Sequence, residues 1–392
     1  MTVFPEYAVH KIVPLKFAGV DLKFKTSQAL FSAHHVDDGT MLLLKTLAQQ
    51  NAVPLQGRVL DAGCGYGPLA LALKKFRPAL EVTARDRLAL AAAFTAENAR
   101  LNGLSVDAAP GLLLDQVPGP WDLVVSNLPA KAGEPVLADF VHRSLGLLAP
   151  GGLCAVVIVA TLAPWFAAEL GRRGAEVVFE EEGPGYRVFH WKARPGSAAP
   201  EPSAFPGAYP RTEVRWDLDP RSFVQKTVYG LPNFDGLDYR LQVSLPLLPK
   251  FPVRGDTLVW EPVQGHLATW ADAILPATDS LILGGNDALG LAATARNLSR
   301  VPVLWNVSFL EDLDLGPGSL GAALVQLHPE PEVPWVDATR DALLRFLSPG
   351  APVLINGSST DLTRFLERHK GLRKVNDVRE KGWRACVLER QG

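Results

Sequence analysis

The sequence is poor in cysteine and has no long apolar stretch. Its 392 residues include only three cysteines, Cys64, Cys154 and Cys386, each far from the others. Isolated cysteines are typical of a reducing compartment, and they match neither a zinc-site spacing nor a disulfide framework. No apolar run reaches the roughly 18 residues of a membrane-spanning helix, and no signal peptide is recognisable. We therefore expect a cytoplasmic protein with no metal site and no membrane contact.

The sequence also lacks an excess of charge of either sign. Its net charge is −2, its charged content is 20% and its apolar content is 47%, as in ordinary globular proteins. Bulk charge therefore predicts no nucleic-acid partner, and any contact with RNA must come from a local basic patch, which we expect in the first half. The candidates for such a patch are Lys23, Lys25, Lys74, Lys75, Arg77, Arg85, Arg87, Lys131, Arg172 and Arg173.

What the sequence does contain is a glycine-rich turn after an apolar strand. It has the form Asp-x-Gly-x-Gly-x-Gly over residues 61–67. Alternate glycines remove the Cβ atoms that keep a ligand away from the backbone, and ligands of open α/β sheets bind at such strand ends. A dinucleotide fingerprint would need glycine where Pro68 stands, and no Lys-Ser/Thr pair of a P-loop follows. The turn therefore predicts a small-molecule site without a phosphate cradle.

The chain alternates between strand patterns and helix patterns, which indicates an α/β fold with a mostly parallel sheet covered on both faces. In the first half we expect strands near 20–25, 59–62, 81–86, 121–126 and 153–159, and helices near 41–47, 69–75, 89–100 and 138–148. Residues 195–210 are rich in proline and alanine, as a semi-rigid linker would be. We therefore expect domains at 1–194 and 211–392.

The second half looks like a copy of the first. With residues 253–270 laid over 55–72, Gly265 meets Gly67, and further along Asn297 meets Asn98. A repeat of this length indicates a duplicated domain and not a solenoid. The proposed ligand positions differ between the copies: Asp61, Gly63, Gly65, Asp86 and Asn127 face Val259, Glu261, Val263, Gly285 and Leu327. We therefore expect the second domain to keep the fold and to lack a cofactor site.

Four segments together carry a family resemblance. They are residues 30–44, the glycine turn at 61–67, residues 122–129 and the closing Gly-Tyr-Arg-Val at 185–188. They resemble the tandem-domain ribosomal RNA guanine-N2 methyltransferases of the RsmC type, within the methyltransferase small domain family. The resemblance implies two tandem Rossmann-like class I methyltransferase domains, each a mostly parallel seven-stranded sheet with helices on both faces, the second degenerate. In that family the degenerate domain usually comes first, so the order here looks reversed.

The same resemblance implies S-adenosyl-L-methionine as cofactor and S-adenosyl-L-homocysteine as product. Asp61 would hold the ammonium group of the cofactor, and Asp86 would accept hydrogen bonds from both ribose hydroxyls. The full set of cofactor-binding residues that we expect is Phe31, Thr40, Asp61, Gly63, Cys64, Gly65, Gly67, Asp86, Arg87 and Asn127.

The catalytic residues that the resemblance implies are Asn127, Leu128 and Pro129. In amino-methylating relatives, the Asn side-chain carbonyl and the next backbone carbonyl hold the target NH₂, so that methyl transfer is an in-line displacement driven by positioning. Here Leu128 replaces a proline and Ala130 replaces an aromatic residue that stacks on the base. The missing ring forfeits roughly 1–3 kcal/mol of stacking.

We therefore expect a monomeric methyltransferase that acts on the exocyclic amine (N2) of a guanine in ribosomal RNA, with ribosomal RNA or a ribosomal subunit as its partner. Two alternatives stay open. The sequence around Asn127 also resembles that of ribosomal-protein amine methyltransferases. The altered motif would equally suit a non-catalytic RNA-binding or assembly protein that retains the cofactor.

Overall fold

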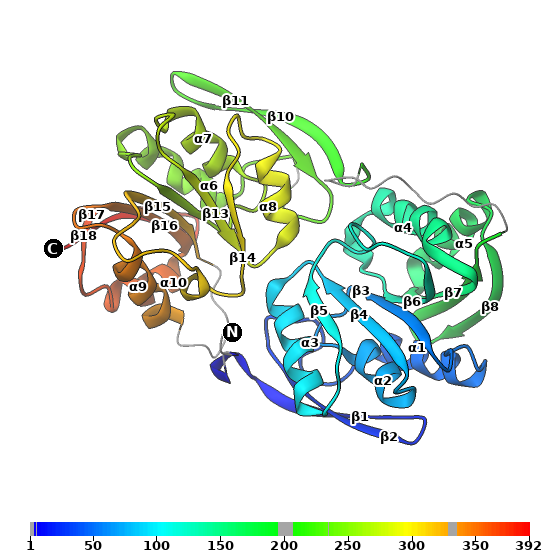
Figure 1. Ribbon diagram of the computed structural model, residues 1–392. Helices are drawn as coiled ribbons and strands as arrows, with labels where there is room; N and C mark the ends of the chain where they lie inside the picture. Colours follow the sequence, from blue (N-terminus) through cyan, green and yellow to red (C-terminus); the bar gives the residue numbers. More distant parts are fainter. Residues whose placement is uncertain (1–3, 5, 195–206, 234, 328–334) are drawn as a thin grey trace. The chain divides into compact units, whose positions relative to one another are not determined.

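The computed structural model divides the chain into two compact units, with the boundary between Tyr209 and Pro210 (Figure 1). The structure describes Phe4 and residues 6–194, 207–233, 235–327 and 335–392. Most of the predicted linker, residues 195–206, lies outside the described residues. Its last residue, Pro210, is the first residue of a strand.

The first unit is built on a seven-stranded sheet in the order β5-β4-β3-β6-β7-β9-β8. All neighbours are parallel except β9, which runs antiparallel to β7 and β8. Its strands are β3 (Gly57–Ala62), β4 (Leu80–Asp86), β5 (Asp107–Pro110), β6 (Trp121–Asn127), β7 (Leu148–Val159), β8 (Glu176–Gly183) and β9 (Tyr186–Lys192). Its helices are α1 (Asp38–Gln49), α2 (Pro68–Phe76), α3 (Ala89–Leu101), α4 (Glu134–Leu147) and α5 (Ala163–Arg172), with short 3₁₀ turns at Glu6–Ala8, Ala130–Ala132 and Ala160–Leu162.

The second unit repeats this topology, with the sheet order β14-β13-β12-β15-β16-β18-β17. Its strands are β12 (Thr257–Trp260), β13 (Leu281–Gly285), β14 (Val303–Asn306), β15 (Ala322–Gln326), β16 (Pro352–Ser358), β17 (Leu372–Glu380) and β18 (Trp383–Arg390). Its helices are α6 (Tyr239–Ser244), α7 (His266–Ile274), α8 (Ala288–Ala295), α9 (Trp335–Phe346) and α10 (Ser359–Glu367), with 3₁₀ turns at Leu245–Lys250 and Leu310–Asp312. The predicted fold class, two mostly parallel seven-stranded sheets in tandem, is confirmed.

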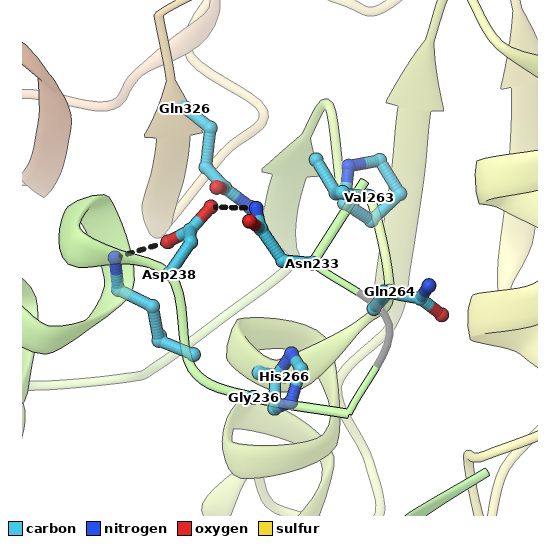
Figure 2. A pocket seen from close by; sticks show the side chains of 9 residues that line it. Asn233, Gly236, Asp238, Val263, Gln264, His266 and Gln326 are labelled. Carbon is cyan, nitrogen blue, oxygen red and sulfur yellow. Dashed lines mark hydrogen bonds between the residues drawn. The ribbon is translucent and has the colours of Figure 1, made fainter. Parts of the chain in front are cut away.

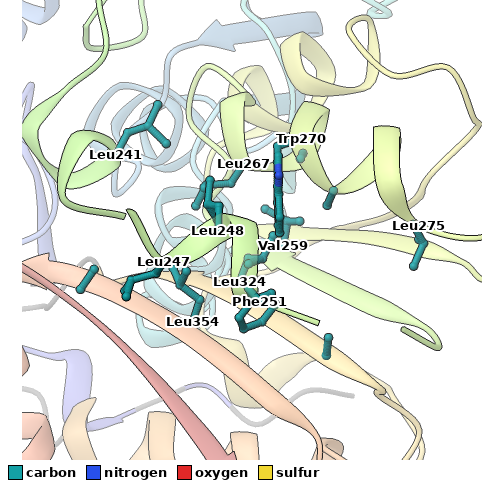
Figure 3. Packing of buried hydrophobic residues seen from close by; sticks show 14 of the residues in the cluster. Leu241, Leu247, Leu248, Phe251, Val259, Leu267, Trp270, Leu275, Leu324 and Leu354 are labelled. Atoms are coloured by element: carbon teal, nitrogen blue, oxygen red, sulfur yellow. The ribbon is translucent and has the colours of Figure 1, made fainter. Parts of the chain in front are cut away.

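The central strands are apolar because helices bury both faces of each sheet. Residues 152–158 of β7 are all buried, as is every residue of β12. In the second unit, Val259 and Leu324 from neighbouring strands pack with Leu267 and Trp270 of α7 in one apolar cluster (Figure 3). This burial fixes the strand register, which in turn decides which residue stands at the end of each strand.

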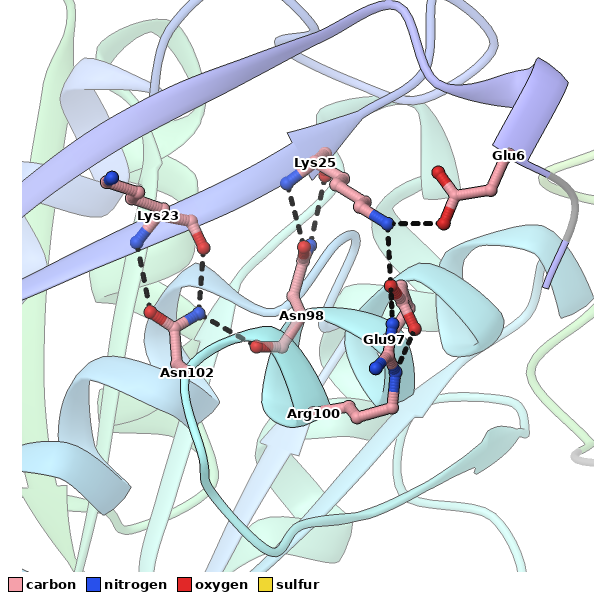
Figure 4. Close-up of polar contacts among 7 residues, drawn as sticks. All are labelled: Glu6, Lys23, Lys25, Glu97, Asn98, Arg100 and Asn102. Atoms are coloured by element: carbon pink, nitrogen blue, oxygen red, sulfur yellow. Dashed lines mark hydrogen bonds and ion pairs between the residues drawn. The ribbon is translucent and has the colours of Figure 1, made fainter.

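Each unit begins with an antiparallel hairpin that one asparagine clamps to the sheet's third helix. In the first unit the hairpin is β1 (Lys11–Phe17) with β2 (Val20–Thr26), and in the second it is β10 (Pro210–Leu218) with β11 (Arg221–Val228). Asn98 accepts from the Lys25 backbone N–H (2.8 Å) and donates to the Lys25 carbonyl (3.0 Å) (Figure 4). Asn297 makes the same pair of bonds with Lys226, at 2.7 and 3.0 Å. The alignment of Asn98 with Asn297 is thereby confirmed.

The glycine turn has the same backbone shape in both units. Gly63, Gly65 and Gly67 have φ values of 86°, 57° and 96°. The corresponding Glu261, Val263 and Gly265 have φ values of 53°, 53° and 93°. A β-branched residue in the left-handed region is a conformational outlier. The second unit thus keeps a turn suited to glycine after two of the three glycines have been replaced.

This strain yields a prediction for Val263. A left-handed conformation costs an L-residue roughly 1–2 kcal/mol, and glycine loses roughly 0.5–1 kcal/mol of chain entropy on folding. We expect Val263→Gly to raise the free energy of unfolding of the second unit by about 1 kcal/mol, measured by urea denaturation. Val301→Gly is the matched control, because Val301 is 96% exposed and has no positive φ. A loss of stability in Val263→Gly equal to that of the control would contradict the argument.

Candidate functional site

The candidate site lies at the carboxyl ends of three neighbouring parallel strands. β3 pairs with β4 on one side and with β6 on the other, and the three strands carry Asp61, Asp86 and Asn127 at or near their ends. These residues were predicted to act together from widely separated parts of the sequence. Because parallel strands in register end at the same edge, the structure brings their side chains to one edge of the sheet.

The glycine turn between β3 and α2 is open at two of its three glycines. A Cβ at Gly65 would meet no atom within 4 Å, and one at Gly63 would meet its nearest atom at 3.8 Å. A Cβ at Gly67 would lie 2.8 Å from a methyl group of Leu71, so this glycine serves helix packing. The Cys64 side chain is buried beside Thr95, which leaves only its backbone to face a ligand.

Asp61, in β3, is fully buried and faces the first turn of α2. Its Oδ2 accepts a hydrogen bond of 2.9 Å from the Ala70 backbone N–H, in the first turn of the helix. Its Oδ1 is buried and has no hydrogen-bond partner among the described residues. Burial raises the pKa of this carboxyl to about 7, opposed by the Ala70 hydrogen bond. An orphaned acceptor of this kind fits a cationic group of a ligand.

Asp86 ends β4 and holds the glycine turn from the side. Its carboxylate accepts from the backbone N–H groups of Gly65 and Leu88, each at 2.9 Å. Burial raises its pKa, and these backbone hydrogen bonds and the charge of Arg87 oppose the rise. The carboxylate thus lies against the open backbone at Gly65, where it can also accept from a ligand hydroxyl.

Asn127 ends β6, and both N–H groups of its side chain are directed at neighbouring oxygens. Nδ2 donates to Asp37 Oδ2 at 2.9 Å and to Thr40 Oγ1 at 3.0 Å. An amide has two donors and one carbonyl acceptor, so these bonds fix which end of the side chain faces each direction. The amide oxygen is left to accept a hydrogen bond from a ligand.

Asp37 and Tyr186 are site residues that the sequence analysis missed. Asp37 caps α1, and Tyr186 donates to Asp37 Oδ1 at 2.8 Å. Burial and the Asp37 contact raise the pKa of Tyr186 to about 12, so it remains a donor at neutral pH. A Cβ at Gly39 would lie 2.7 Å from the Tyr186 ring. Both missed residues stand inside the segments that carry the family resemblance, which was the available signal.

The other predicted residues differ in exposure. Leu128 is buried, and its backbone N–H donates to Val157 on β7, so only its carbonyl can serve a ligand. Pro129 and Ala130 are exposed, and no aromatic ring follows Asn127. Phe31 is 70% exposed on the segment that leads to α1. Its ring is therefore largely exposed to solvent.

In the second unit, a side chain fills the position of the glycine turn. Glu261, the counterpart of Gly63, accepts from the Asn286 backbone N–H at 2.7 Å. A Cβ at Gly285, the counterpart of Asp86, would lie 3.4 Å from the Glu261 carboxyl. In the second unit, the carboxylate beside the turn therefore belongs to Glu261 of the turn itself, and the end of β13 supplies none.

One part of the predicted alignment is wrong by one residue. The strand pairings match Asp61 to Val125 and Val259 to Leu324, so Gln326 and not Leu327 is the counterpart of Asn127. The next strand agrees, because Asn127 pairs with Val157 and Gln326 with Asn356. The sequence alignment set Asn127 against a residue 200 positions later, whereas the strand pairings keep the 199-residue offset that already relates Asp86 to Gly285.

Much of the predicted basic patch is used inside the first unit. Lys25 pairs with Glu6 and Glu97 at 2.6 and 2.7 Å (Figure 4). Arg85 pairs with Asp107 at 2.7 Å. Arg172 and Arg173 both pair with Glu169, and Lys74 donates to two backbone carbonyls. Lys23, Lys75 and Lys131 are exposed. RNA contact by these three, and by Arg77 and Arg87, stays a prediction.

Among the residues that the structure describes, no cluster of three or more His, Cys, Asp or Glu side chains is placed to hold a metal ion. None of the described helices is long and apolar enough to cross a membrane.

The strand order and the glycine turn at the end of the first central strand define the class I methyltransferase fold. Residues 21–189 match the family model described as the methyltransferase small domain. The match lies within the first unit and covers most of it.

The chain is also similar in sequence to curated methyltransferases. The chain is 34% identical over 146 residues to the ribosomal RNA small subunit methyltransferase C of Pasteurella multocida, an alignment that covers 36% of this chain and 43% of that protein. It is 36% identical over 141 residues to the release factor glutamine methyltransferase of Deinococcus radiodurans, over 30% of this chain and 51% of that protein. These alignments span about half of each relative or less.

The solved structure of the T. thermophilus 16S rRNA guanine-N2 methyltransferase RsmC, in complex with AdoMet and guanosine, matches with a TM-score of 0.65. The match covers 98% of this chain and 99% of that one at 17% identity. The tandem fold is therefore shared over the whole chain.

The buried carboxyl of Asp61 predicts a pH dependence of stability. The pKa of Asp61 is about 7 in the folded protein against an ordinary value of 3.8. Its contribution to stability is therefore fully present below pH 4 and is lost as the pH rises through 7. We expect the free energy of unfolding of the first unit to fall by on the order of 2–4 kcal/mol over this window.

Asp61→Asn should remove most of this dependence, because an amide does not titrate and its oxygen can still accept from Ala70. Urea denaturation between pH 4 and pH 8 measures the effect. Asp21→Asn, at an exposed carboxylate on β2, is the control and should leave the slope unchanged. Equal slopes in all three proteins would show that Asp61 titrates normally.

Proposed function

We propose that the protein is an S-adenosylmethionine-dependent methyltransferase that acts on the exocyclic N2 amine of a guanine in ribosomal RNA. The observation that carries the proposal is the fixed orientation of Asn127, whose amide oxygen is left to accept a hydrogen bond from an amine. Asp37, Thr40 and Tyr186 maintain that orientation.

The residues of the first unit fit the cofactor. The orphaned Asp61 Oδ1 suits the ammonium of its methionine part, directly or through water. The bare backbone at Gly63 and Gly65 lets a ligand approach, and Asp86 can accept from ribose hydroxyls beside it. Thr40, a proposed cofactor-binding residue, accepts a hydrogen bond from Asn127, which holds the target amine. The exposed Phe31 is available to cover the ligand.

The chemistry requires positioning more than acid or base strength. The bound cofactor supplies a methyl group on a positively charged sulfur, which leaves as a neutral thioether. The Asn127 amide oxygen and the Leu128 carbonyl accept the two N–H bonds of the target amine and so direct its lone pair at the methyl carbon. The amine loses a proton to water after transfer. In-line positioning of this kind accounts for a large part of the rate.

Ribosomal RNA is favoured as substrate by the sequence similarity to ribosomal RNA small subunit methyltransferase C and by the tandem fold shared with RsmC. One observation favours a second candidate. The similarity to a release factor glutamine methyltransferase, together with the absence of an aromatic residue at Ala130, suits a protein amide as the acceptor. Both acceptors present a planar NH₂ group to Asn127.

The deciding experiment is transfer of labelled methyl from S-adenosylmethionine to ribosomal subunits from a strain that lacks this protein. We expect label in the RNA at guanine N2. Label in a ribosomal protein or a release factor, with none in RNA, would support the second candidate. No transfer to either, with the cofactor still bound, would support a non-catalytic RNA-binding protein.

Asn127→Ala tests the mechanism. We expect kcat to fall roughly 100- to 1,000-fold, the range seen when one preorganised hydrogen-bonding group is removed from an active site. The Kd for the cofactor, measured by titration calorimetry, should change only a few-fold. Gln49→Ala, at an exposed amide at the end of α1, is the control. An Asn127→Ala enzyme with undiminished kcat would remove this residue from the mechanism.

A further inference from the structure

The second unit contains a polar pocket at the carboxyl ends of β12 and β15. Its lining includes Asn233, Asp238, Val263, His266 and Gln326. Figure 2 shows the end of the Gln326 side chain beside Asp238 and Asn233. Asn233 donates to Asp238 Oδ2 at 2.9 Å, which holds that carboxylate in place. The pocket therefore joins residues from the segment before α6, the turn before α7 and the end of β15.

This pocket is the counterpart of the amine-binding half of the first site. Gln326 stands at the strand position of Asn127, as the pairings of two neighbouring strands require. Asp238 caps α6 and accepts from the N–H three residues later, as Asp37 does at α1. An amide and a carboxylate thus occur in the same places in both units.

Two of the polar side chains that line the pocket are buried. Gln326 is 6% exposed and His266 is 7% exposed. His266 Nε2 has no hydrogen-bond partner among the described residues. Burial lowers the pKa of His266 to about 4, so its ring is neutral at pH 7. A buried, unpaired ring nitrogen in a polar pocket is satisfied by a group from outside the chain, either an ordered water or a ligand.

We propose that this pocket binds the hydrogen-bonding edge of an RNA nucleobase and so acts as a docking site that does not methylate. The inference rests on the proposed function, because the occupant is assigned by likeness to the amine-binding half of the first site. The cofactor half is blocked in the second unit, where Glu261 fills the turn. Val263 stands there in place of Gly65, the glycine of the first unit that has open space beside it. A base edge at this pocket would therefore have no methyl donor beside it.

The chemistry of the lining suits a purine edge. The Gln326 amide offers a donor and an acceptor side by side. The Asp238 carboxylate already accepts from Leu241, Asn233 and Arg240, and its remaining lone pair can accept from a ring or exocyclic N–H group. Sequence-specific RNA recognition uses unstacked bases whose edges pair with such groups. Guanine, with adjacent N–H donors and a carbonyl acceptor, is the base that best matches this set.

The test is photocrosslinking of the full chain to small-subunit ribosomal RNA transcribed with 6-thioguanosine, with the crosslinked peptides identified by mass spectrometry. We expect a crosslink to peptides that contain the pocket residues of the second unit. Gln326→Glu keeps the size of the side chain and replaces an N–H donor with a charge next to Asp238, so this crosslink should fall at least five-fold. Gln391→Ala, at an exposed amide of the same unit, should leave it unchanged.

The result separates this proposal from the proposed function. In an Asn127→Ala background the pocket crosslink should persist, because the first site is not needed for it. A pocket crosslink in a protein that methylates no RNA would retain the docking site and reject the enzyme. RNA methylation without a pocket crosslink, or with one that Gln326→Glu does not weaken, would reject the docking site and retain the enzyme.

Discussion

The structure of the first site depends on the two hydrogen bonds that the Asn127 amide nitrogen donates to Asp37 and Thr40. A free asparagine presents either its oxygen or its nitrogen to a ligand, and only the oxygen can hold an amine. These bonds select the oxygen. They require the cap of α1 to lie against the end of β6, a placement that the buried strand register and the close contact of Gly39 with Tyr186 enforce. The fold therefore controls the chemistry through the orientation of one side chain.

The two units show which features belong to the fold and which to the ligand. The asparagine clamp on the hairpin, the left-handed turn and the helix cap by aspartate occur in both. They persist because each satisfies backbone groups that any chain with this topology must satisfy. The bare turn and the carboxylate at the end of the second strand occur only in the first. Because packing does not require the bare turn or this carboxylate, we attribute both features to ligand binding.

Sequence reasoning recovered the order of elements and the glycine turn, because apolar periodicity and alternate glycines are local signals. It placed Asp61, Asp86 and Asn127 at one edge because parallel strands end together. It missed Asp37 and Tyr186, whose contact joins residues 149 positions apart in the sequence. It also assigned Lys25 to a solvent-facing patch, whereas that lysine lies between Glu6 and Glu97. Such pairings depend on tertiary contacts and leave no local pattern.

The shift from Leu327 to Gln326 changes the meaning of the second unit. With an apolar residue opposite Asn127, both halves of the ancestral site would be lost together. With Gln326 there, the loss is confined to the half that needs bare backbone, on β12 and β13, and spares the half on β15 and the α6 cap. The two halves lie on different elements, so substitutions in one need not disturb the other. Replacement of two glycines at positive φ has a cost in stability, and filling the turn with Glu261 removes a cavity that an absent ligand would leave. In the polar pocket, Asp238 still serves the fold as the cap of α6, but a buried His266 nitrogen without a partner among the described residues destabilises the unit. We therefore attribute the retention of the buried amide of Gln326, and not that of Asp238, to a ligand.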